Sequence, residues 1–317
     1  MQRVGEEPVG HGSFGIVYRG LYGSQDVAIK LLQKSTTDGY PFICKGLYKE
    51  AVVWKYLSHP NIVPFLGVED RGLYLGLISE WMPRGHLHNH IQAHPDAERL
   101  PLIMDVAYGL QYLHSFGIVH GDLKGINVLV DVEGHARLAD FGISRIVYAT
   151  DSVNAMTAVT PGQGTVYWMA PEVLDPEQYG INEKEDPMPE SDIYSLAMLM
   201  WEIFTGHRPF ADARTSAAVT FRILSGKRPP RTPAATARGI SDSLWELMKQ
   251  CWDEDRHKRP NMTTVIKELQ RALGECYAHP YVDNVIIVTS SSCASSATRS
   301  MNVRQRKHFV YAACAEM

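Results

Sequence analysis

Residues 120–130 read HGDLKGINVLV, and this stretch decides how the rest of the sequence is interpreted. It places a carboxylate, an ammonium group and an amide at Asp122, Lys124 and Asn127, directly before an apolar run with strand character. Two glycines in the stretch interrupt any regular element, so the three polar side chains are predicted to lie on a loop. Chemistry is often found on a loop held between rigid elements, and the stretch therefore predicts a functional site.

The composition is that of an ordinary globular protein, with 317 residues, 45% of them hydrophobic, and a formal charge of −4. The length predicts one large domain or two moderate ones. The small negative charge gives no support for binding to nucleic acid or to an anionic membrane. The chain opens without a secretory signal, and its apolar runs are shorter than a membrane span needs. The five cysteines form no CxxC pair, which favours free thiols in a reducing compartment, and we expect a cytoplasmic protein.

Sequence patterns predict a strand-rich beginning and a mainly helical remainder. The run at 15–32, interrupted by Gly23, Ser24 and Asp26, predicts an antiparallel hairpin, and 73–81 predicts a further strand. Helical periodicity is found at 46–59, 98–115, 192–206, 240–252 and 263–273. The helix at 192–206 is apolar nearly all round, which is typical of a helix buried inside a larger domain.

Gly10, Gly12 and Gly15 form a GxGxxG pattern, which alone is a weak signal. A dinucleotide-binding enzyme would need a helix to open at the third glycine, whereas the following residues, IVYRG, favour a strand. A glycine loop between two strands can instead lie over a phosphate chain, because missing side chains let backbone N–H groups come close. A glycine-rich turn without a ligand is the alternative.

Lys30 ends the run VAIK at 27–30 and is predicted to share one face of its strand with Ala28. An isolated lysine there would most simply be a solvated surface residue. However, Glu50 lies beside the apolar stripe of the predicted helix 46–59, where a carboxylate is unusual without a partner. Lys30 is the obvious candidate for that partner.

The motif LADFG places Asp140 between an apolar strand and the pair Phe141 and Gly142. Asp122, Asn127 and Asp140 together offer the hard oxygens that a magnesium–phosphate site requires. Each of them alone could be a turn residue. Their joint occurrence in this order predicts the site.

Together these motifs resemble the signature of the eukaryotic protein kinases over about residues 4–273. The glycine loop, VAIK, the helix glutamate, HGDLKGIN, DFG, APE, SDIYSLAMLMWE and CWDEDRHKRP follow one another in the family's order. YWMAPE, CW and RP are similar to the tyrosine-kinase-like branch. Lys124 and Thr165 match serine/threonine rather than tyrosine specificity in that family.

This resemblance implies an α+β, bilobal protein-kinase fold. A small antiparallel β-rich N-lobe with one main helix would occupy about 4–81, and a hinge about 80–85. A larger, mainly α-helical C-lobe would occupy about 86–273. The remaining residues, 274–317, are small and polar in large part and are predicted to form a disordered tail. The basic cluster at 304–307 in that tail is compatible with a nuclear address.

The resemblance also implies a role for each matching residue. The three glycines would cover the triphosphate of ATP, and Lys30, held by Glu50, would contact its α- and β-phosphates. Asn127 and Asp140 would bind Mg²⁺, with Mn²⁺ as a possible substitute. Asp122 would accept the proton of the substrate hydroxyl, and Lys124 would steady the γ-phosphate.

Further matching positions would bind the adenine or support the site. The residues that would enclose the adenine or offer hinge hydrogen bonds are Val9, Val17, Ala28, Leu129, Glu80 and Met82. Ser79 falls at the gatekeeper position. Glu172 would pair with Arg259, and Asp192 would brace the catalytic loop.

Gly121 is a departure from the family, most of which has arginine there. That arginine normally pairs with a phosphorylated activation segment. Without it, a phosphate at Thr157 or Thr160 loses a charged hydrogen bond of about 1.5–3 kcal/mol. We therefore expect activity to depend only weakly on phosphorylation of that segment.

The leading prediction is an ATP- and magnesium-dependent serine/threonine kinase that phosphorylates protein hydroxyls in intracellular signalling. The alternative is a pseudokinase scaffold that binds partners without turnover. A dinucleotide-binding enzyme is disfavoured, because no helix is expected after the glycine loop. Protein substrates are the expected partners, and the sequence leaves the oligomeric state open.

Overall fold

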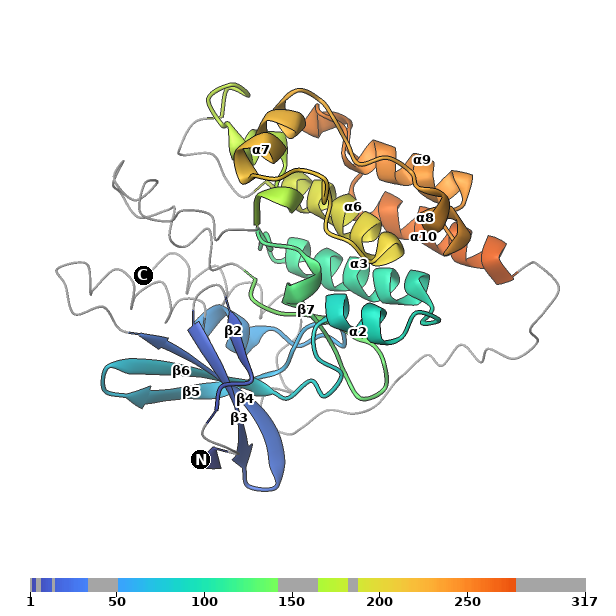
Figure 1. Cartoon of the computed structure of the whole chain (residues 1–317). Coiled ribbons are helices and arrows are strands. Elements are labelled where there is room, and N and C mark those ends of the chain that lie inside the picture. The colour runs from blue at the N-terminus through green and yellow to red at the C-terminus, as the bar shows by residue number, and fades with distance from the viewer. Residues whose placement is uncertain are drawn as a thin grey trace.

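The computed structural model describes residues 2–3, 7–12, 15–33, 51–141, 165–181 and 188–277. It has a sheet built mainly from the first part of the chain and a bundle of helices from the remainder (Figure 1). This is the bilobal α+β arrangement that the sequence predicts.

One antiparallel sheet forms the N-terminal lobe, with strand order β1-β3-β4-β6-β5 and β2 paired to β3. Its strands are β1 (Gln2–Arg3), β2 (Gly10–Gly12), β3 (Gly15–Tyr22), β4 (Gln25–Gln33), β5 (Phe65–Arg71) and β6 (Tyr74–Glu80). A strand, and no helix, therefore follows the glycine pattern, as predicted. This excludes the strand–turn–helix unit that a dinucleotide-binding site needs.

The predicted hairpin forms between β3 and β4. Tyr22 pairs with Gln25 across a two-residue turn in which Gly23 has φ 63°. Glycine is favoured at such a turn, because it adopts positive φ without a steric cost. The predicted break is too wide, however: Asp26 lies inside β4 opposite Leu21.

The two faces of β4 have different neighbours. Val27, Ile29 and Leu31 are buried on one face, in a small cluster with Ile78. The opposite face carries Lys30, as the alternation predicts. The position opposite Lys30 on β6, Leu77, is buried in the main core, which also contains residues of the helical lobe.

The helical lobe is built around α6 (Pro189–Thr205), nearly all of whose residues are buried. The other helices are α2 (Leu87–Ala93), α3 (Arg99–Ser115), α5 (Pro171–Leu174), α7 (Ser216–Leu224), α8 (Pro233–Ala237), α9 (Asp242–Cys251) and α10 (Met262–Tyr277). Short 3₁₀ turns form η1 (Gly125–Asn127), η2 (Thr165–Trp168) and η3 (Arg256–Lys258), and a small sheet joins β7 (Val128–Val130) to β8 (Ala136–Leu138).

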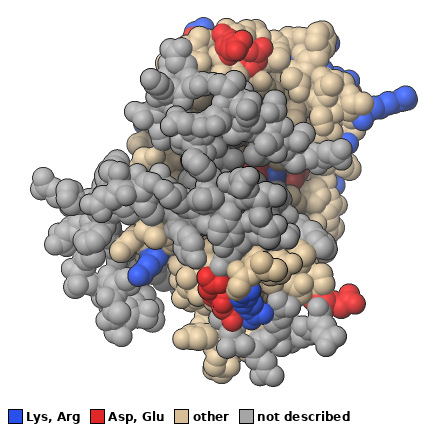
Figure 2. Space-filling model, turned by 90° about the vertical axis from the view of Figure 1, so that its left-hand side faces the viewer, with Lys and Arg blue, Asp and Glu red and all other residues tan. Residues whose placement is uncertain are grey.

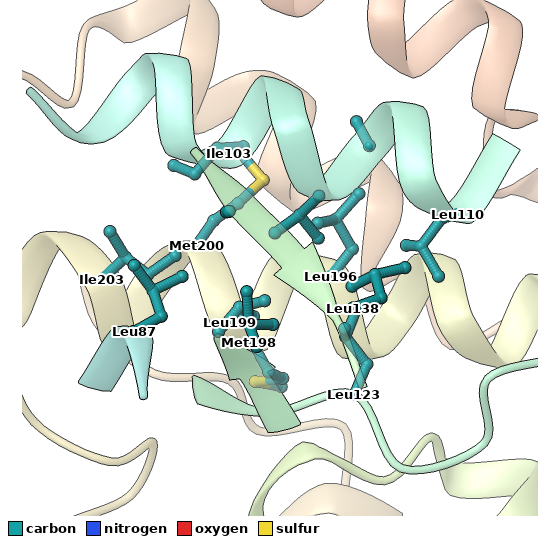
Figure 3. Close-up of a cluster of buried hydrophobic side chains, with 14 of the residues drawn as sticks. Leu87, Ile103, Leu110, Leu123, Leu138, Leu196, Met198, Leu199, Met200 and Ile203 are labelled. Atoms are coloured by element: carbon teal, nitrogen blue, oxygen red, sulfur yellow. The ribbon is translucent and has the colours of Figure 1, made fainter. Parts of the chain in front are cut away.

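Helices α3 and α6 pack against the small sheet through apolar side chains. Figure 3 shows Leu110 of α3 and Leu196 of α6 beside Leu138 of β8. All three side chains are fully buried. The predicted apolar face of α3 and the all-round burial of α6 are thus confirmed, and this packing fixes the segment between α3 and β7.

The predicted start of α9 is confirmed, whereas the predicted end of α10 is not. The Ser241 side chain accepts a hydrogen bond from the Leu244 N–H and so caps α9. Helix α10 continues to Tyr277, beyond the predicted end at 273, so the first four residues of the predicted disordered tail, 274–277, are helical. The rest of that tail lies outside the described residues. Of the predicted helix 46–59, residues 51–56 are described as helical. Among the described residues, none of the helices has both the length and the apolar character required to cross a membrane.

Candidate active site

The loop that carries HGD is held by a buried carboxylate from the central helix. Asp192 of α6 accepts hydrogen bonds from the backbone N–H groups of His120 (2.7 Å) and Gly121 (2.9 Å), and from Nε2 of His114 (2.8 Å). Burial alone would raise the pKa of Asp192, but His114 and the other donors outweigh it and keep the pKa below its usual value. The predicted bracing role therefore has a direct geometric basis.

Gly121 adopts φ 74°, in the left-handed region that glycine enters freely. This backbone conformation points its N–H at Asp192. The neighbouring His120 ring is fully buried, and burial lowers its pKa despite nearby carboxylates. Its Nδ1 accepts the Asp122 N–H at 3.3 Å, as a neutral imidazole can.

Asp122, Lys124 and Asn127 meet, as the sequence predicts for this loop. Lys124 Nζ lies 2.7 Å from Asp122 Oδ2 and donates to Thr165 Oγ1 at 2.8 Å. The Asn127 amide donates to both the backbone oxygen and Oδ2 of Asp122, each at 2.8 Å. Within the described residues, the buried second oxygen of Asp122, Oδ1, has no hydrogen-bond partner.

Asp140 comes from the other side of the small sheet, directly after β8. The Ala139 N–H donates to the backbone oxygen of Asn127 (3.0 Å), which holds Asp140 beside η1. Lys30 Nζ donates to Asp140 Oδ1 at 2.7 Å, across the two lobes. Burial favours a raised pKa for Asp140, but the Lys30 ammonium group outweighs it and the pKa is lowered. Asp140 is therefore ionised at neutral pH.

The segment directly after β8 is held in place by the packing of Phe141. Phe141 is buried, with its ring edge-on to Trp54 (5.6 Å between centroids) and to His120 (6.3 Å). Asp140 has φ 56°, which is uncommon for a residue other than glycine. Strained backbone of this kind persists where surrounding packing imposes it, and it is concentrated at functional sites.

The donor set fits a magnesium ion that is held together with substrate phosphates. Asp140 is an ionised carboxylate, and Asn127 donates only through its amide nitrogen, which leaves its amide oxygen available as a hard ligand. In the part of the chain that is described, no group of three or more His, Cys, Asp or Glu side chains could hold a metal ion by itself. Mg²⁺ commonly takes only one or two carboxylates and completes its shell with phosphates and water.

The nucleotide-binding residues predicted on the sheet share one face. Val17 of β3 is opposite Lys30 on β4, and Ala28, two positions before Lys30, is opposite Ser79. Ser79 is buried at the end of β6, where the chain leaves the sheet.

The remaining predicted adenine-site residues lie around this face and the connection between the lobes. The Val9 N–H donates to the Val17 oxygen (2.9 Å), and the three glycines lie in the β2–β3 hairpin, where Gly12 pairs with Gly15. Glu80, at the end of β6, and the buried Met82 lie where the chain passes from the sheet to the helical lobe. Leu129 lies on β7 and forms an isolated antiparallel β-bridge with His86.

One predicted site residue, Glu50, and its pairing with Lys30 lie outside the described residues. The same holds for Gly142 and for the candidate phosphorylation positions Thr157 and Thr160. The predicted structural pair is present: Arg259 donates to both oxygens of Glu172, at 2.5 and 2.8 Å, with both side chains buried.

Sequence reasoning missed Glu202, a buried carboxylate on α6 that contacts the loop carrying Asp122 and Lys124. It accepts hydrogen bonds from the Gly125 N–H (3.0 Å), Trp168 Nε1 (2.8 Å) and His88 Nδ1 (2.7 Å). A signal was available, because a glutamate within the apolar run SLAMLMWEIF needs buried partners. The positions of those partners in the sequence could not be read from that run.

Charges on the described surface are mixed in sign. On the face shown in Figure 2, acidic and basic side chains of the described residues are interspersed without a large patch of one sign.

Comparisons with known proteins agree with the geometry. A family model described as "Protein tyrosine and serine/threonine kinase" matches residues 4–269. Serine/threonine-protein kinase STY17 of Arabidopsis thaliana is 32% identical over 274 residues, which cover 85% of this chain and 44% of that protein. Serine/threonine-protein kinase CTR1 of the same plant is 33% identical and is matched over 84% of this chain and 31% of its own length.

A fungal relative shows the same relation. Mitogen-activated protein kinase kinase kinase mkh1 of Cytospora mali is 30% identical over 82% of this chain and 14% of its own length. The chain thus spans less than half the length of these curated relatives. The matched region coincides with the bilobal fold and its interlobe site, and we conclude that the chain belongs to the protein tyrosine and serine/threonine kinase family.

Proposed function

We propose that this chain is a catalytically active, ATP-dependent protein serine/threonine kinase rather than a pseudokinase scaffold. The single observation that carries the proposal is the cluster at the loop: Asp122 is bonded to both Lys124 and Asn127. The Lys30–Asp140 pair reaches the same segment from the other lobe. Phosphoryl transfer depends on positioning and charge stabilisation, which such an arrangement supplies.

Asp122 is suited to accept the proton of a substrate hydroxyl. Its Oδ2 is occupied by Lys124 and Asn127, whereas its Oδ1 has no partner within the described residues. The hydroxyl oxygen then bonds to the γ-phosphorus as the bond to the β–γ bridging oxygen breaks, and ADP leaves. The proton ends on Asp122, and Lys124 balances the negative charge on the transferred group.

Asp140 and Asn127 would hold the metal, and Lys30 would hold the α- and β-phosphates after exchanging its contact with Asp140. Mg²⁺ neutralises charge on the phosphate oxygens when it is bound with ATP. Val9, Val17, Ala28 and Leu129 would enclose the adenine beside Glu80 and Met82, and Gly10, Gly12 and Gly15 would lie over the phosphates.

Serine/threonine specificity is supported by the contact between Lys124 and Thr165. The hydrogen bond of 2.8 Å ties the catalytic loop to η2, the segment that follows the undescribed region. The relatives reported above carry the same specificity in their names. Cysteine usage favours a reducing compartment such as the cytoplasm for this chain.

The test is ATP turnover onto a degenerate array of serine, threonine and tyrosine peptides with Mg²⁺ present. We expect phosphorylation of serine and threonine, and loss of it in Asp122→Asn. A soluble, folded wild-type chain that binds Mg²⁺–ATP without turnover would establish the scaffold instead. A preference for tyrosine would overturn the specificity, and absence of nucleotide binding would overturn the whole proposal.

A further inference from the structure

A charged pair and an aromatic ring join the β3–β4 hairpin to the connection between the lobes. Arg19 of β3 donates to both carboxylate oxygens of Asp26 on β4, from Nε at 3.0 Å and from Nη2 at 2.8 Å. Its guanidinium carbon lies over the Trp81 ring, 5.4 Å from the centroid. Trp81 directly follows β6 and donates its backbone N–H to the Asp26 oxygen at 3.3 Å. Arg19 thus binds the hairpin and covers the ring of the connecting segment.

The row of the sheet that carries Arg19 also carries residues proposed to line the nucleotide site. Arg19 is paired with Ala28 across β3 and β4, and Ala28 is paired with Ser79 across β4 and β6. Directly opposite residues in antiparallel strands lie on one face of the sheet, so Arg19 is on the face that would enclose the adenine. Asp26, two positions before Ala28, shares that face.

Trp81 stands between Glu80 and Met82, the two residues whose backbone is proposed to bind the adenine. The Glu80 N–H donates to the Pro64 oxygen at 3.1 Å. The Met82 oxygen accepts from the Gly85 N–H, also at 3.1 Å. These bonds hold the connecting segment on either side, whereas the charged pair on the hairpin holds its middle. Movement of Trp81 would therefore turn the peptide groups on both of its sides.

The geometry of the Arg19–Asp26 pair matters more than its charge. The two side chains are 42% and 41% exposed, and ion pairs in such surroundings contribute little by charge alone. The two-point contact, however, fixes the plane of the guanidinium group, and a planar guanidinium can stack on an indole ring. The hydrogen bonds from Arg19 also lower the pKa of Asp26, so the carboxylate is ionised at neutral pH.

We propose that Arg19 is a positioning residue for nucleotide selection, which stacks on Trp81 and keeps the backbone of Glu80 and Met82 aligned with the edge of an adenine. This inference rests on the proposed ATP-dependent activity. Arg19 does not touch the nucleotide in this scheme. Discrimination between adenine and guanine nucleotides therefore depends on a side chain of the β3–β4 hairpin.

The first test measures the Kd of ATP and of GTP, each with Mg²⁺, for the wild type and for Arg19→Ala. The two nucleotides share ribose and triphosphate, but adenine presents an amino group where guanine presents a carbonyl oxygen. We expect Arg19→Ala to raise the Kd of ATP about 3–5-fold, the size of effect that a partly exposed cation–ring contact has. The Kd of GTP should stay unchanged. Equal weakening of both nucleotides would overturn the proposal.

Arg71→Ala is the matched control. Arg71 pairs with Glu69 at 2.8 Å on β5, the strand at the far edge of the same sheet, and both side chains are 29% exposed. We expect this variant to bind both nucleotides as the wild type does. If it weakens ATP as much as Arg19→Ala, the effect comes from surface charge and the proposal fails. Arg19→Lys should recover only part of the loss, because lysine keeps the charge without the two-point contact.

The second test is a double-mutant cycle with Trp81→Leu, which removes the aromatic face. Alone, this substitution should also raise the Kd of ATP. In the Trp81→Leu background, Arg19→Ala should cause little further change, because the contact through which Arg19 acts is already lost. Full additivity of the two effects would contradict a role for Arg19 through the ring.

A third measurement needs neither turnover nor nucleotide. The Trp81 amide donates to the Asp26 oxygen, so its hydrogen exchange should become faster in Arg19→Ala and keep the wild-type rate in Arg71→Ala. Unchanged exchange in Arg19→Ala would overturn the positioning role. If the wild-type chain binds no nucleotide while exchange responds as expected, the proposed function fails and the link between hairpin and connection stands.

Discussion

At the scale of single residues, the site depends on charged groups placed in surroundings with little water. The Lys30 and Asp140 side chains are only 10% and 24% exposed, and Lys124 is buried beside Asp122. In such surroundings each charge needs its partner, because an unpaired buried charge is strongly unfavourable. The scarcity of water also strengthens the electrostatic attraction between each of these groups and a phosphate.

Removing either member of the interlobe pair should abolish useful turnover. We expect Lys30→Met and Asp140→Asn each to lower kcat by about 10²–10³-fold, or roughly 3–4 kcal/mol of transition-state stabilisation. Each variant should lose some stability, because the remaining charge stays in surroundings with little water. The fold should be retained, because neither residue belongs to the apolar core. Steady-state kinetics and circular dichroism check this. Wild-type rates in either folded variant would refute the assignment of the site.

His59 gives a pH dependence to stability. Burial lowers the pKa of His59 to about 4, its ring stacks on Tyr112 at 4.7 Å, and its Nδ1 accepts the Asn61 N–H. Between pH 4 and the unfolded value near 6.5, the unfolded chain therefore binds more protons than the folded one. The contribution of this group is complete above that window and is lost as the pH falls through it.

Urea unfolding at pH 7.5 and pH 5 would measure this effect for the wild type and for His59→Asn, which keeps an acceptor but does not titrate. We expect the free energy of unfolding of the wild type to fall more on acidification than that of His59→Asn. The extra slope against pH should correspond to the uptake of less than one proton. Equal losses in the two proteins would remove His59 as the cause.

At the scale of elements, helix α3 shows how packing overrides intrinsic helix propensity. Gly109 lies in the middle of α3, where glycine is unfavourable by about 1 kcal/mol relative to alanine. A Cβ there would lie 2.8 Å from the Asn61 backbone oxygen and 2.9 Å from Cδ1 of Leu138. The close approach of α3 to β8 and to the backbone at Asn61 therefore requires the glycine.

We expect Gly109→Ala to destabilise the protein, because overpacking costs about 1–3 kcal/mol and exceeds the gain in propensity. Gly274→Ala in α10 is the matched control, since nothing lies within 4 Å of the added atom. It should stabilise the protein by up to about 1 kcal/mol. Chemical denaturation of both variants would show this, and a neutral or stabilising Gly109→Ala would contradict the packing argument.

At the scale of the whole molecule, a buried ion pair joins segments of the helical lobe that are far apart in the chain. Arg259 and Glu172 are separated by 87 positions, with side chains 0% and 1% exposed. Arg259 also donates to the backbone oxygens of Asp253 and Glu190. The pair therefore connects α5, the start of α6 and the loop before α10.

Breaking this pair should be strongly destabilising. We expect Glu172→Gln to cost about 3–5 kcal/mol, because it leaves the Arg259 charge buried without its counterion. Glu246→Gln is the comparison, since Glu246 pairs with Lys249 at the surface with 57% of its side chain exposed. That loss should be within about 1 kcal/mol. Similar melting temperatures for the two variants would show that the buried pair adds no stability.

Regulation is the second property of the whole molecule, and we expect it to be shaped by Gly121. No cation at this position can meet a phosphate on the activation segment, so Thr157→Ala combined with Thr160→Ala should retain most of the turnover. Phosphatase treatment of the wild type should have an equally small effect. A strict requirement for phosphate at either threonine, measured by kinetics before and after dephosphorylation, would contradict this hypothesis.

Much of this architecture could be predicted because its signals are local. Alternation placed Lys30 and Ala28 on one face of β4 and apolar residues on the other, and hydrophobic periodicity identified α3 and α6. Short motifs named the residues that meet at the loop, and a serine before an apolar helix marked the cap of α9. Boundaries were less accurate, since Asp26 belongs to a strand and α10 is longer than its apolar stripe.

Tertiary structure alone decided which distant groups meet. Lys30 binds Asp140 across 110 positions, and Glu202 receives donors from α2, η1 and η2. Contacts of this kind leave no periodic pattern in the sequence, because they depend on how separately formed elements pack. The sequence thus determined the residue types and the elements that carry them. Packing around α6 determined their geometry, because only a common core can bring segments so far apart in the chain within hydrogen-bonding distance.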